Sequence, residues 1–105
     1  MTAGQVVAVV ALLASMYGVD PALLDCIAYR ESSYRVDAVN GVHQGVMQWH
    51  PDTRAWLAEK ANAGPLWLHG GIGEGPVQDV ALAAWSIKQG YGSHWATGGI
   101  CGGEQ

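Results

Sequence analysis

Residues 17–53 read YGVDPALLDCIAYRESSYRVDAVNGVHQGVMQWHPDT, and this stretch decides the fold. Asp20 stands directly before Pro21. This pair is typical of a helix start, because aspartate caps the first turn and proline suits the first helical position. The apolar residues that follow recur at helical spacing. The stretch therefore predicts a helix over residues 21–33.

A segment without helical spacing follows over residues 34–49. Asn40 and Gly41 form a turn signal inside it, so a short hairpin fits there. Pro51 opens the next helix, which we expect to run to about residue 62. The stretch therefore predicts two helices joined by an irregular loop or hairpin.

The flanking sequence predicts further helices. Thr2 and Gln5 have the spacing of a capping box, which starts a helix over residues 3–17. The remaining expected segments are a glycine-rich loop, a helix and a short turn, at residues 66–75, 76–90 and 93–97. The expected fold class is all-α, or at most an α-dominated α+β fold. It has about four to six helices, with a small loop or hairpin beside a cleft.

The composition limits the class of protein. The chain has 105 residues, of which 50% are apolar and 13% are charged. These values predict one domain over residues 1–105 and exclude intrinsic disorder, which needs low hydrophobicity and high charge. The net charge is −4 and only five residues are Lys or Arg. We therefore expect no nucleic-acid partner, and a monomer.

The apolar run at residues 6–14 is the place to look for a membrane segment. It is too short for a membrane span, which needs about 20 residues. No basic residue precedes Arg30, so the run does not resemble a secretory signal either. We expect a buried helix without stable membrane insertion, and export through a lysis system, a virion or a longer parent protein. A membrane-active lysis helix is the alternative.

The chain contains two cysteines, Cys26 and Cys101. An even count in a small, loop-rich chain favours a disulfide, and two free thiols are the alternative. No Cys-x-x-Cys pair or Cys/His cluster occurs, and the four histidines lack helical metal-ligand spacing. Neither a metal nor a cofactor is therefore predicted. The histidines are interpreted as polar or cleft residues, and they gain positive charge below about pH 6.5.

Glu31 lies on the apolar side of the predicted helix 21–33. At about 100° per residue, it falls between Ile27 and Leu24 on the helical wheel. Burial raises the pKa of a carboxyl group, and the negative end of the helix dipole acts in the same direction. A carboxyl group that keeps its proton near neutral pH suits general-acid catalysis. The alternative is a structural glutamate that pairs with Arg30, Arg35 or Arg54.

Several motifs follow one another in this stretch. They are Val19-Asp20-Pro21 at the helix start, Glu31-Ser32, then Tyr34, Ala38 and Asn40, then Gly45-Val46-Met47-Gln48, and finally Thr53. This series resembles the soluble lytic transglycosylase domain family, which shares a lysozyme-like fold with goose-type lysozymes and resuscitation-promoting factors. The Tyr-Asn-Ala-Gly motif that the family carries late in the domain is absent. The resemblance implies a compact lysozyme-like fold.

The end of the chain is similar to that of resuscitation-promoting factors. It reads Gly90-Tyr91-Gly92-Ser93-His94-Trp95, with Cys101 beyond. In those proteins the end cysteine bonds to a cysteine just before the catalytic glutamate. Cys26 lies five residues before Glu31, so the resemblance implies the Cys26–Cys101 pairing.

The resemblance implies a peptidoglycan-degrading muramidase that acts outside the cytoplasm. It would cleave the β-1,4 bond between N-acetylmuramic acid and N-acetylglucosamine in glycan strands, with Glu31 donating the proton. The implied substrate-binding residues are Ser32, Tyr34, Asn40, Gly45, Met47, Gln48, Trp49, Tyr91 and Trp95. For each aromatic residue among them, core packing is the alternative to a sugar contact.

Inverting hydrolysis requires a second carboxylate. The candidates are Asp37, Asp52, Glu74 and Asp79, of which none stands out, and Asp37 is kept as a possible second carboxylate six residues after Glu31. The related enzymes use a single acid, which then takes a proton from the sugar's own 6-hydroxyl. Lytic transglycosylation is therefore favoured over hydrolysis, and both stay open. The alternative function is a non-catalytic glycan-binding or phage-tail module with a lysozyme-like fold.

Overall fold

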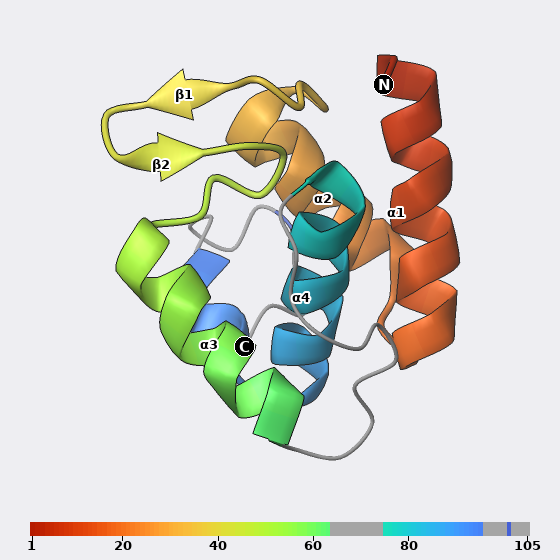
Figure 1. The fold of residues 1–105 in the computed structure, drawn as a ribbon. Helices are drawn as coiled ribbons and strands as arrows, with labels where there is room; N and C mark the ends of the chain where they lie inside the picture. Colours follow the sequence, from red (N-terminus) through yellow and green to blue (C-terminus); the bar gives the residue numbers. More distant parts are fainter. Residues whose placement is uncertain (64–74, 96–100, 102–105) are drawn as a thin grey trace.

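The computed structural model describes residues 1–63, 75–95 and 101. Most of the predicted loop at 66–75 and the last two residues of the predicted turn at 93–97 lie outside the described residues. The elements are α1 (Ala3–Tyr17), α2 (Pro21–Ser32), β1 (Val39–Asn40), β2 (His43–Gln44), α3 (Pro51–Ala63), α4 (Pro76–Lys88) and the 3-10 helix η1 (Gly92–Trp95). Figure 1 shows α4 at the centre of these elements. The predicted helix-dominated fold class is confirmed.

Helix α1 has the bounds that the sequence predicts. The Thr2 hydroxyl accepts a hydrogen bond from the Gln5 amide (3.2 Å), and the Gln5 side-chain oxygen accepts one from the Thr2 amide (2.8 Å). Gly18 ends the helix at φ 68°, a left-handed conformation that glycine adopts without steric cost. Both ends are therefore set by local interactions within a few residues.

Helix α2 begins as predicted and ends one residue early. The Asp20 carboxylate accepts a hydrogen bond from the Ala22 amide (3.0 Å), which caps the first turn. At the other end Ser33 has a left-handed conformation (φ 53°), and Tyr34 follows with φ 64°. Two consecutive non-glycine residues at positive φ are uncommon. They turn the chain sharply and leave Glu31 in the last turn of the helix.

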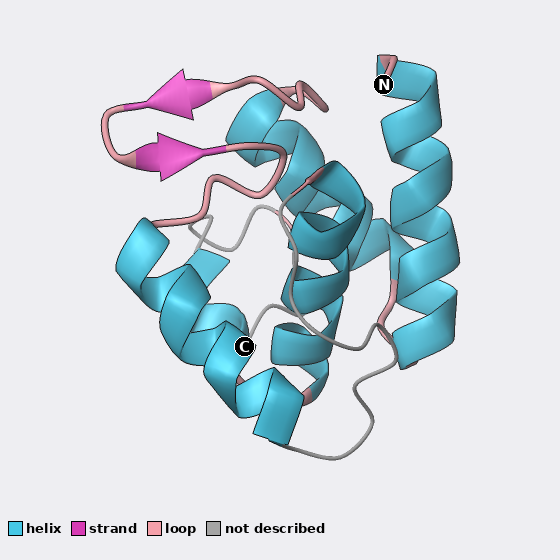
Figure 2. Cartoon of the chain, in the orientation of Figure 1, coloured by secondary structure: helices cyan, strands magenta, loops and turns pink. Residues whose placement is uncertain are grey.

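A small antiparallel ribbon confirms the predicted hairpin. Val39 pairs with Gln44, and Asn40 pairs with His43. Beyond it, Gln44 forms a further bridge to Trp49, with hydrogen bonds of 3.1 and 2.9 Å between their backbones. The ribbon lies on the side of the molecule away from α1 (Figure 2). We call the β1–β2 pair together with the bridged residue Trp49 the ribbon.

Helix α4 forms the centre of the core. Its residues 80–87 are all buried, as expected of a helix that is covered on every side. Helices α1 and α3 both pack against it, and α2 packs against α1. The helix ends at Lys88 rather than at the predicted residue 90, because the chain turns there and Gly90 has φ 95°.

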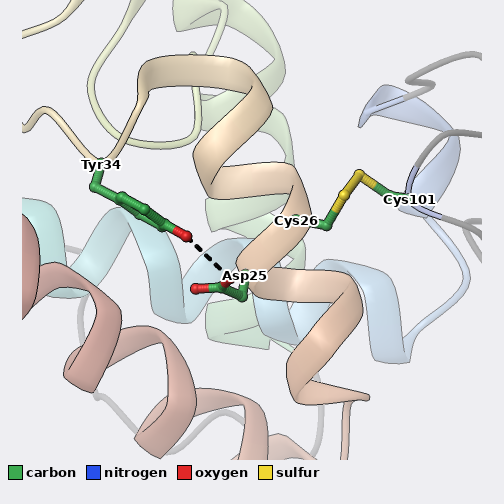
Figure 3. Close-up of a disulfide and its surroundings, with 4 residues drawn as sticks. All are labelled: Asp25, Cys26, Tyr34 and Cys101. Carbon is green, nitrogen blue, oxygen red and sulfur yellow. Dashed lines mark hydrogen bonds between the residues drawn. A yellow bond between two sulfur atoms is a disulfide. The ribbon is translucent and has the colours of Figure 1, made fainter.

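The expected disulfide is present between Cys26 and Cys101 (Figure 3). It joins the middle of α2 to a residue 75 positions later in the chain. In the chain-entropy account, closing a loop of this length stabilises the fold by roughly 4.5 kcal/mol. The helix that carries Glu31 is therefore tied covalently to the end of the chain.

Of the helices in the described residues, none combines the length and the hydropathy that a bilayer crossing requires. The same part of the chain holds no group of three or more His, Cys, Asp or Glu side chains arranged around a common point for a metal ion.

Candidate active site

Glu31 lies at the rim of the core, in the last turn of α2. Ile27 and Ala28 below it are fully buried, whereas the Glu31 side chain is partly exposed. Burial raises the pKa of Glu31 above its ordinary value, and the positive charge of His43 partly offsets that rise. The apolar side of α2 therefore holds a carboxyl group that retains its proton to higher pH than an exposed glutamate.

The arginines that could have paired with Glu31 are engaged elsewhere or exposed. Arg54 forms an ion pair with Asp79 at 2.7 Å. Arg35 donates from Nε to the Ser32 carbonyl at 3.4 Å, and Arg30 is exposed. Within the described ranges 1–63 and 75–95, no ion pair forms on Glu31. Its environment is thus not that of a salt-bridged structural glutamate.

Ser32 and Tyr34 hold the end of α2 in place. The Ser32 hydroxyl is buried and donates to the Ala28 carbonyl one turn earlier (3.1 Å). The Tyr34 hydroxyl donates to the Asp25 carboxylate at 2.9 Å (Figure 3). Burial of Tyr34, and then this bond and the charge of Asp25, raise the pKa of its hydroxyl. At about 100° per residue, Asp25 lies roughly 120° around α2 from Glu31, so the Tyr34 hydroxyl is turned away from Glu31.

Gln48 fixes the base of the ribbon. Its side chain is only 7% exposed, and its amide nitrogen donates to the carbonyls of Ala38 (3.1 Å) and Gly45 (2.9 Å). Its side-chain oxygen is buried and, within the described part of the chain, accepts no hydrogen bond. Met47 is fully buried, and its carbonyl accepts a hydrogen bond from the Trp95 indole (2.9 Å). These predicted site residues hold the loop that follows β2 in one conformation.

The pairing of the ribbon places a row of polar side chains on one face. Residues directly opposite each other in antiparallel strands share a face. Asn40 is therefore on the same face as His43. The Gln44–Trp49 bridge makes His43 and His50 the next opposite pair, and their rings are in edge contact at 5.8 Å. We call Asn40, His43 and His50 the polar row.

Sequence reasoning assigned no specific role to His43 or His50. One sequence signal indicates that the two histidines are opposite each other: four residues separate His43-Gln44 from Trp49-His50. A four-residue loop is a common hairpin connection, and it brings the two histidines opposite each other.

A pocket of about 240 Å³ lies beside the polar row. It is lined by His43, Gln48, Trp49, His50, Thr53 and Trp95. His43 is one of these lining residues, and its charge also acts on the Glu31 carboxyl group. Three of the predicted site residues, Gln48, Trp49 and Trp95, thus line one pocket.

Trp49 and Trp95, which are predicted to bind sugars with core packing as the alternative, are largely buried. They are 4% and 3% exposed, and their rings contact each other edge to face at 4.7 Å. The Trp49 indole also donates to the Asp79 carbonyl (3.1 Å). Because protein atoms cover the ring faces, these two residues pack in the core. Each presents only part of its ring to the pocket.

Comparison with protein families agrees with the series of motifs. The family model of the transglycosylase SLT domain matches residues 9–94. The chain belongs to this family. Neither a curated protein nor a solved structure matches it. SLT domains act on peptidoglycan and are typically glycosidases or transglycosylases. The disulfide in this SLT domain is typical of proteins outside the cytoplasm.

Tyr91 lies apart from the polar row in this SLT domain. Its ring contacts Trp56 at 5.5 Å and Trp85 at 6.4 Å. It lines a second pocket, of about 340 Å³, with Lys60, Ala63, Trp85 and Gln89. Tyr91 therefore lines a different pocket from Gln48, Trp49 and Trp95. Trp56, which sequence reasoning missed, is 46% exposed beside Tyr91.

Asp37, the candidate second carboxylate, is exposed in the turn between α2 and β1. Its side chain has neither a hydrogen-bond partner nor an ion-pair partner in the described part of the SLT domain. Asn40 is also exposed, as part of the polar row. Both side chains are open to solvent on the same stretch of chain that leads from Glu31 to the pocket.

Proposed function

We propose that this SLT domain cleaves the β-1,4 bond between N-acetylmuramic acid and N-acetylglucosamine in peptidoglycan, with Glu31 as the general acid. The proposal depends on the burial of the Glu31 carboxyl group and on its raised pKa. This group is partly buried and has no cationic ion-pair partner in the described residues, and burial raises its pKa. The charge of His43, which lines a pocket, acts on this carboxyl group.

The proposed reaction starts with proton transfer from the Glu31 carboxyl to the bridging oxygen. The bond between that oxygen and the anomeric carbon breaks, and its electron pair stays on the oxygen, which leaves as a hydroxyl. The transition state has oxocarbenium character. The sugar's 6-hydroxyl then attacks the anomeric carbon and gives its proton to the Glu31 carboxylate. This step forms a 1,6-anhydro end and regenerates the acid.

Other residues of the proposed site bind the sugars. His50 lines the pocket, and Asn40 is exposed on the same face of the ribbon. The side-chain oxygen of Gln48 accepts no hydrogen bond within residues 1–63 and 75–95, and an amide oxygen can accept a hydrogen bond from an N-acetyl N–H group. Gly45 and Met47 support the site through their backbone carbonyls, which accept hydrogen bonds, and Ser32 supports it through its hydroxyl, which donates to the Ala28 carbonyl.

The test is the Glu31→Gln variant assayed for lysis of purified peptidoglycan. We expect a loss of about 10²–10⁴-fold, the usual contribution of a general acid. Glu59→Gln is the matched control, because Glu59 is an exposed glutamate on α3. Persistence of lysis at the wild-type rate in Glu31→Gln would falsify the proposal. Failure of the wild type to lyse while still binding peptidoglycan favours the non-catalytic glycan-binding module.

The pH dependence of folding gives an independent check. A carboxyl group whose pKa is raised in the folded state stabilises the fold below its unfolded pKa, and this contribution is lost as pH rises through the folded pKa. Glu31→Gln cannot ionise. We therefore expect it to be at least as stable as the wild type above that pH, measured by chemical denaturation, so that lost lysis is not lost folding.

The mass of the products separates the two candidate reactions. An anhydro end is lighter by one water than a hydrolysed end, so mass spectrometry of the released fragments decides between them. The Asp37→Asn variant tests whether Asp37 is the second carboxylate. If Asp37 activates water, this variant loses hydrolysis and its hydrolysed products disappear. If Glu31 alone does the chemistry, the products keep their anhydro ends.

A further inference from the structure

The pocket of about 340 Å³ lies between the end of α3 and the end of α4. Its lining residues are Lys60, Ala63, Trp85, Gln89 and Tyr91, and it shares none of them with the pocket beside the polar row. Trp85 is a buried part of this lining, 3% exposed. The ring of Tyr91 stacks on that of Trp85, with 6.4 Å between the centroids and 21° between the planes. The pocket is therefore lined by two aromatic rings and two polar side chains.

Trp56 extends this lining on the surface of α3. Its ring contacts the Tyr91 ring edge to face at 5.5 Å, and the Lys60 ammonium nitrogen lies 4.8 Å from its ring centroid. Trp56, Lys60 and Ala63 are four and seven residues apart, so they lie on one side of α3. Trp56 is 46% exposed, although a tryptophan is usually buried for the most part. An aromatic ring and a positive charge are thus presented side by side at the surface.

We call Trp56, Lys60, Trp85, Gln89 and Tyr91 the aromatic site.

The backbone after α4 holds Tyr91 in place. The Tyr91 amide donates to the Ser86 carbonyl (2.8 Å), and the Gln89 amide donates to the Trp85 carbonyl (3.0 Å). Gly90 between them has φ 95°, a conformation that favours glycine. The turn is therefore fixed against α4, and the aromatic site is formed before a ligand arrives, as ligand sites usually are.

We propose that the aromatic site is a second glycan-binding site, which takes a sugar ring that carries a carboxylate group. This inference rests on the action of SLT domains on peptidoglycan and not on the role of Glu31. The C–H face of a pyranose ring is apolar and packs on an aromatic ring such as that of Trp56. N-acetylmuramic acid carries a lactyl carboxylate where its peptide stem has been removed, and the Lys60 ammonium group can pair with it.

The charges around the aromatic site favour this ligand. The chain has a net charge of −4, so an anionic glycan needs a local positive charge in order to bind. Lys60 supplies it from the lining of the pocket. Glu59 is exposed and lies about 100° around α3 from Lys60. Lys88 lies toward α1, with its Nζ atom 3.5 Å from the place of a Cβ added to Gly18.

The experiment is an NMR titration of the full chain with two disaccharides. The first is N-acetylglucosaminyl-N-acetylmuramic acid, which carries the lactyl carboxylate. The second is diacetylchitobiose, which has the same backbone without that group. Neither contains the bond between N-acetylmuramic acid and N-acetylglucosamine that the proposed reaction cleaves, so binding is measured without turnover. We expect both disaccharides to shift the indole N–H signal of Trp56, and the first to bind about two- to fivefold more tightly, the usual size of an exposed ion pair.

Four variants assign the contributions. Trp56→Ala is expected to weaken the binding of both disaccharides by about tenfold, measured from the Gln89 side-chain amide signals that all the proteins keep. Lys60→Gln should remove the preference for the muramyl disaccharide and leave chitobiose binding nearly unchanged. The matched controls are Leu12→Ala, at a 60% exposed apolar residue of α1, and Lys88→Gln, at an exposed lysine of α4. Both should bind like the wild type.

The outcomes test the glycan and its carboxylate in turn. A Trp56 signal that stays in place at the highest soluble concentration of either disaccharide overturns the site, and so does equal binding by Trp56→Ala and Leu12→Ala. A preference for the muramyl disaccharide that persists in Lys60→Gln overturns the role of the carboxylate. A Trp56 signal that moves with protein concentration alone and not with sugar assigns the surface to a second copy of the chain.

The proposed reaction fails or stands separately from this site. Lysis that survives in Glu31→Gln removes the general acid and leaves the binding of the disaccharides to the aromatic site intact. Loss of lysis in Glu31→Gln, together with a Trp56 signal that does not respond to sugar, keeps the general acid and overturns the second glycan site.

Discussion

The two faces of the ribbon are opposite in character although they come from the same twelve residues. One face carries the polar row of Asn40, His43 and His50, and the two histidines line a pocket of about 240 Å³. The other carries Gln44 and the buried Trp49, which line a larger pocket of about 480 Å³ toward the Arg54–Asp79 ion pair. Successive side chains of a strand point to opposite faces. The polar side chains therefore lie on one face of the ribbon, and the side chain that anchors it to the core lies on the other.

This arrangement makes register the critical property of the ribbon. A slip of one residue would exchange the two faces and move His43 to the opposite face. The indole of Trp49 opposes such a slip, because it is buried and bonded to the Asp79 carbonyl on α4 (3.1 Å). Substitutions on the anchoring face should therefore affect stability, and substitutions on the polar row should affect activity.

The largest effect is expected from Trp49→Leu. The variant loses buried aromatic area and the bond to the Asp79 carbonyl, so we expect a loss of about 2–4 kcal/mol in the free energy of unfolding. Denaturation in urea measures it. Trp56→Leu is the matched control, because Trp56 is 46% exposed. Its loss should be clearly smaller, and equal losses for both variants would contradict the anchoring role of Trp49.

A medium effect is expected from Gly45→Ala, just after β2. Gly45 has φ 82°, and an added Cβ would lie 3.1 Å from an Asp79 carboxylate oxygen. We expect a loss of about 1–2 kcal/mol from backbone strain and the close contact together. Gly41→Ala isolates the strain, since Gly41 has φ 65° with no heavy atom within 4 Å of an added Cβ. The contact with Asp79 is refuted if the two variants lose the same free energy.

The smallest effect on stability is expected from the pair Asn40→Ala and Val39→Ala. Both side chains are exposed on neighbouring positions but on opposite faces of the ribbon. Each should change the free energy of unfolding by less than about 0.5 kcal/mol. Peptidoglycan lysis should fall in Asn40→Ala only, because only Asn40 belongs to the polar row. A fall in Val39→Ala of the same size would show that the two faces do not differ in function.

The helix bounds could be predicted closely because interactions between residues near in sequence determine where the helices begin. The Thr2 capping box and Asp20 before Pro21 satisfy backbone donors within three residues, and the bounds of α1 match the prediction. The early end of α2 could not be predicted, since Ser33 and Tyr34 adopt positive φ without being glycines. In this conformation the Tyr34 hydroxyl donates to the Asp25 carboxylate, nine residues earlier in the chain.

The site was predicted in part. Glu31 was identified from its place on the helical wheel, and the structure places it at the edge of the core. The roles of the aromatic residues were not visible in the sequence. Trp49 and Trp95 turned out to be core residues, while Tyr91 contacts Trp56 in a different pocket. The sequence does not show whether the ring face of a tryptophan is buried or exposed, because this depends on the side chains that pack against it in the fold.

The order of residues alone determines where helices start, which of their sides is apolar, and that one acid stands on that side. These features depend on caps and on a period of 3.6 residues, which act over a few positions. Tertiary structure decides which distant side chains meet. The ring of His43 contacts the ring of His50 only because the bridge between Gln44 and Trp49 sets them opposite each other, and the charge of His43 acts on Glu31 from a separate element. The charge acting on the proposed acid is therefore a property of the fold.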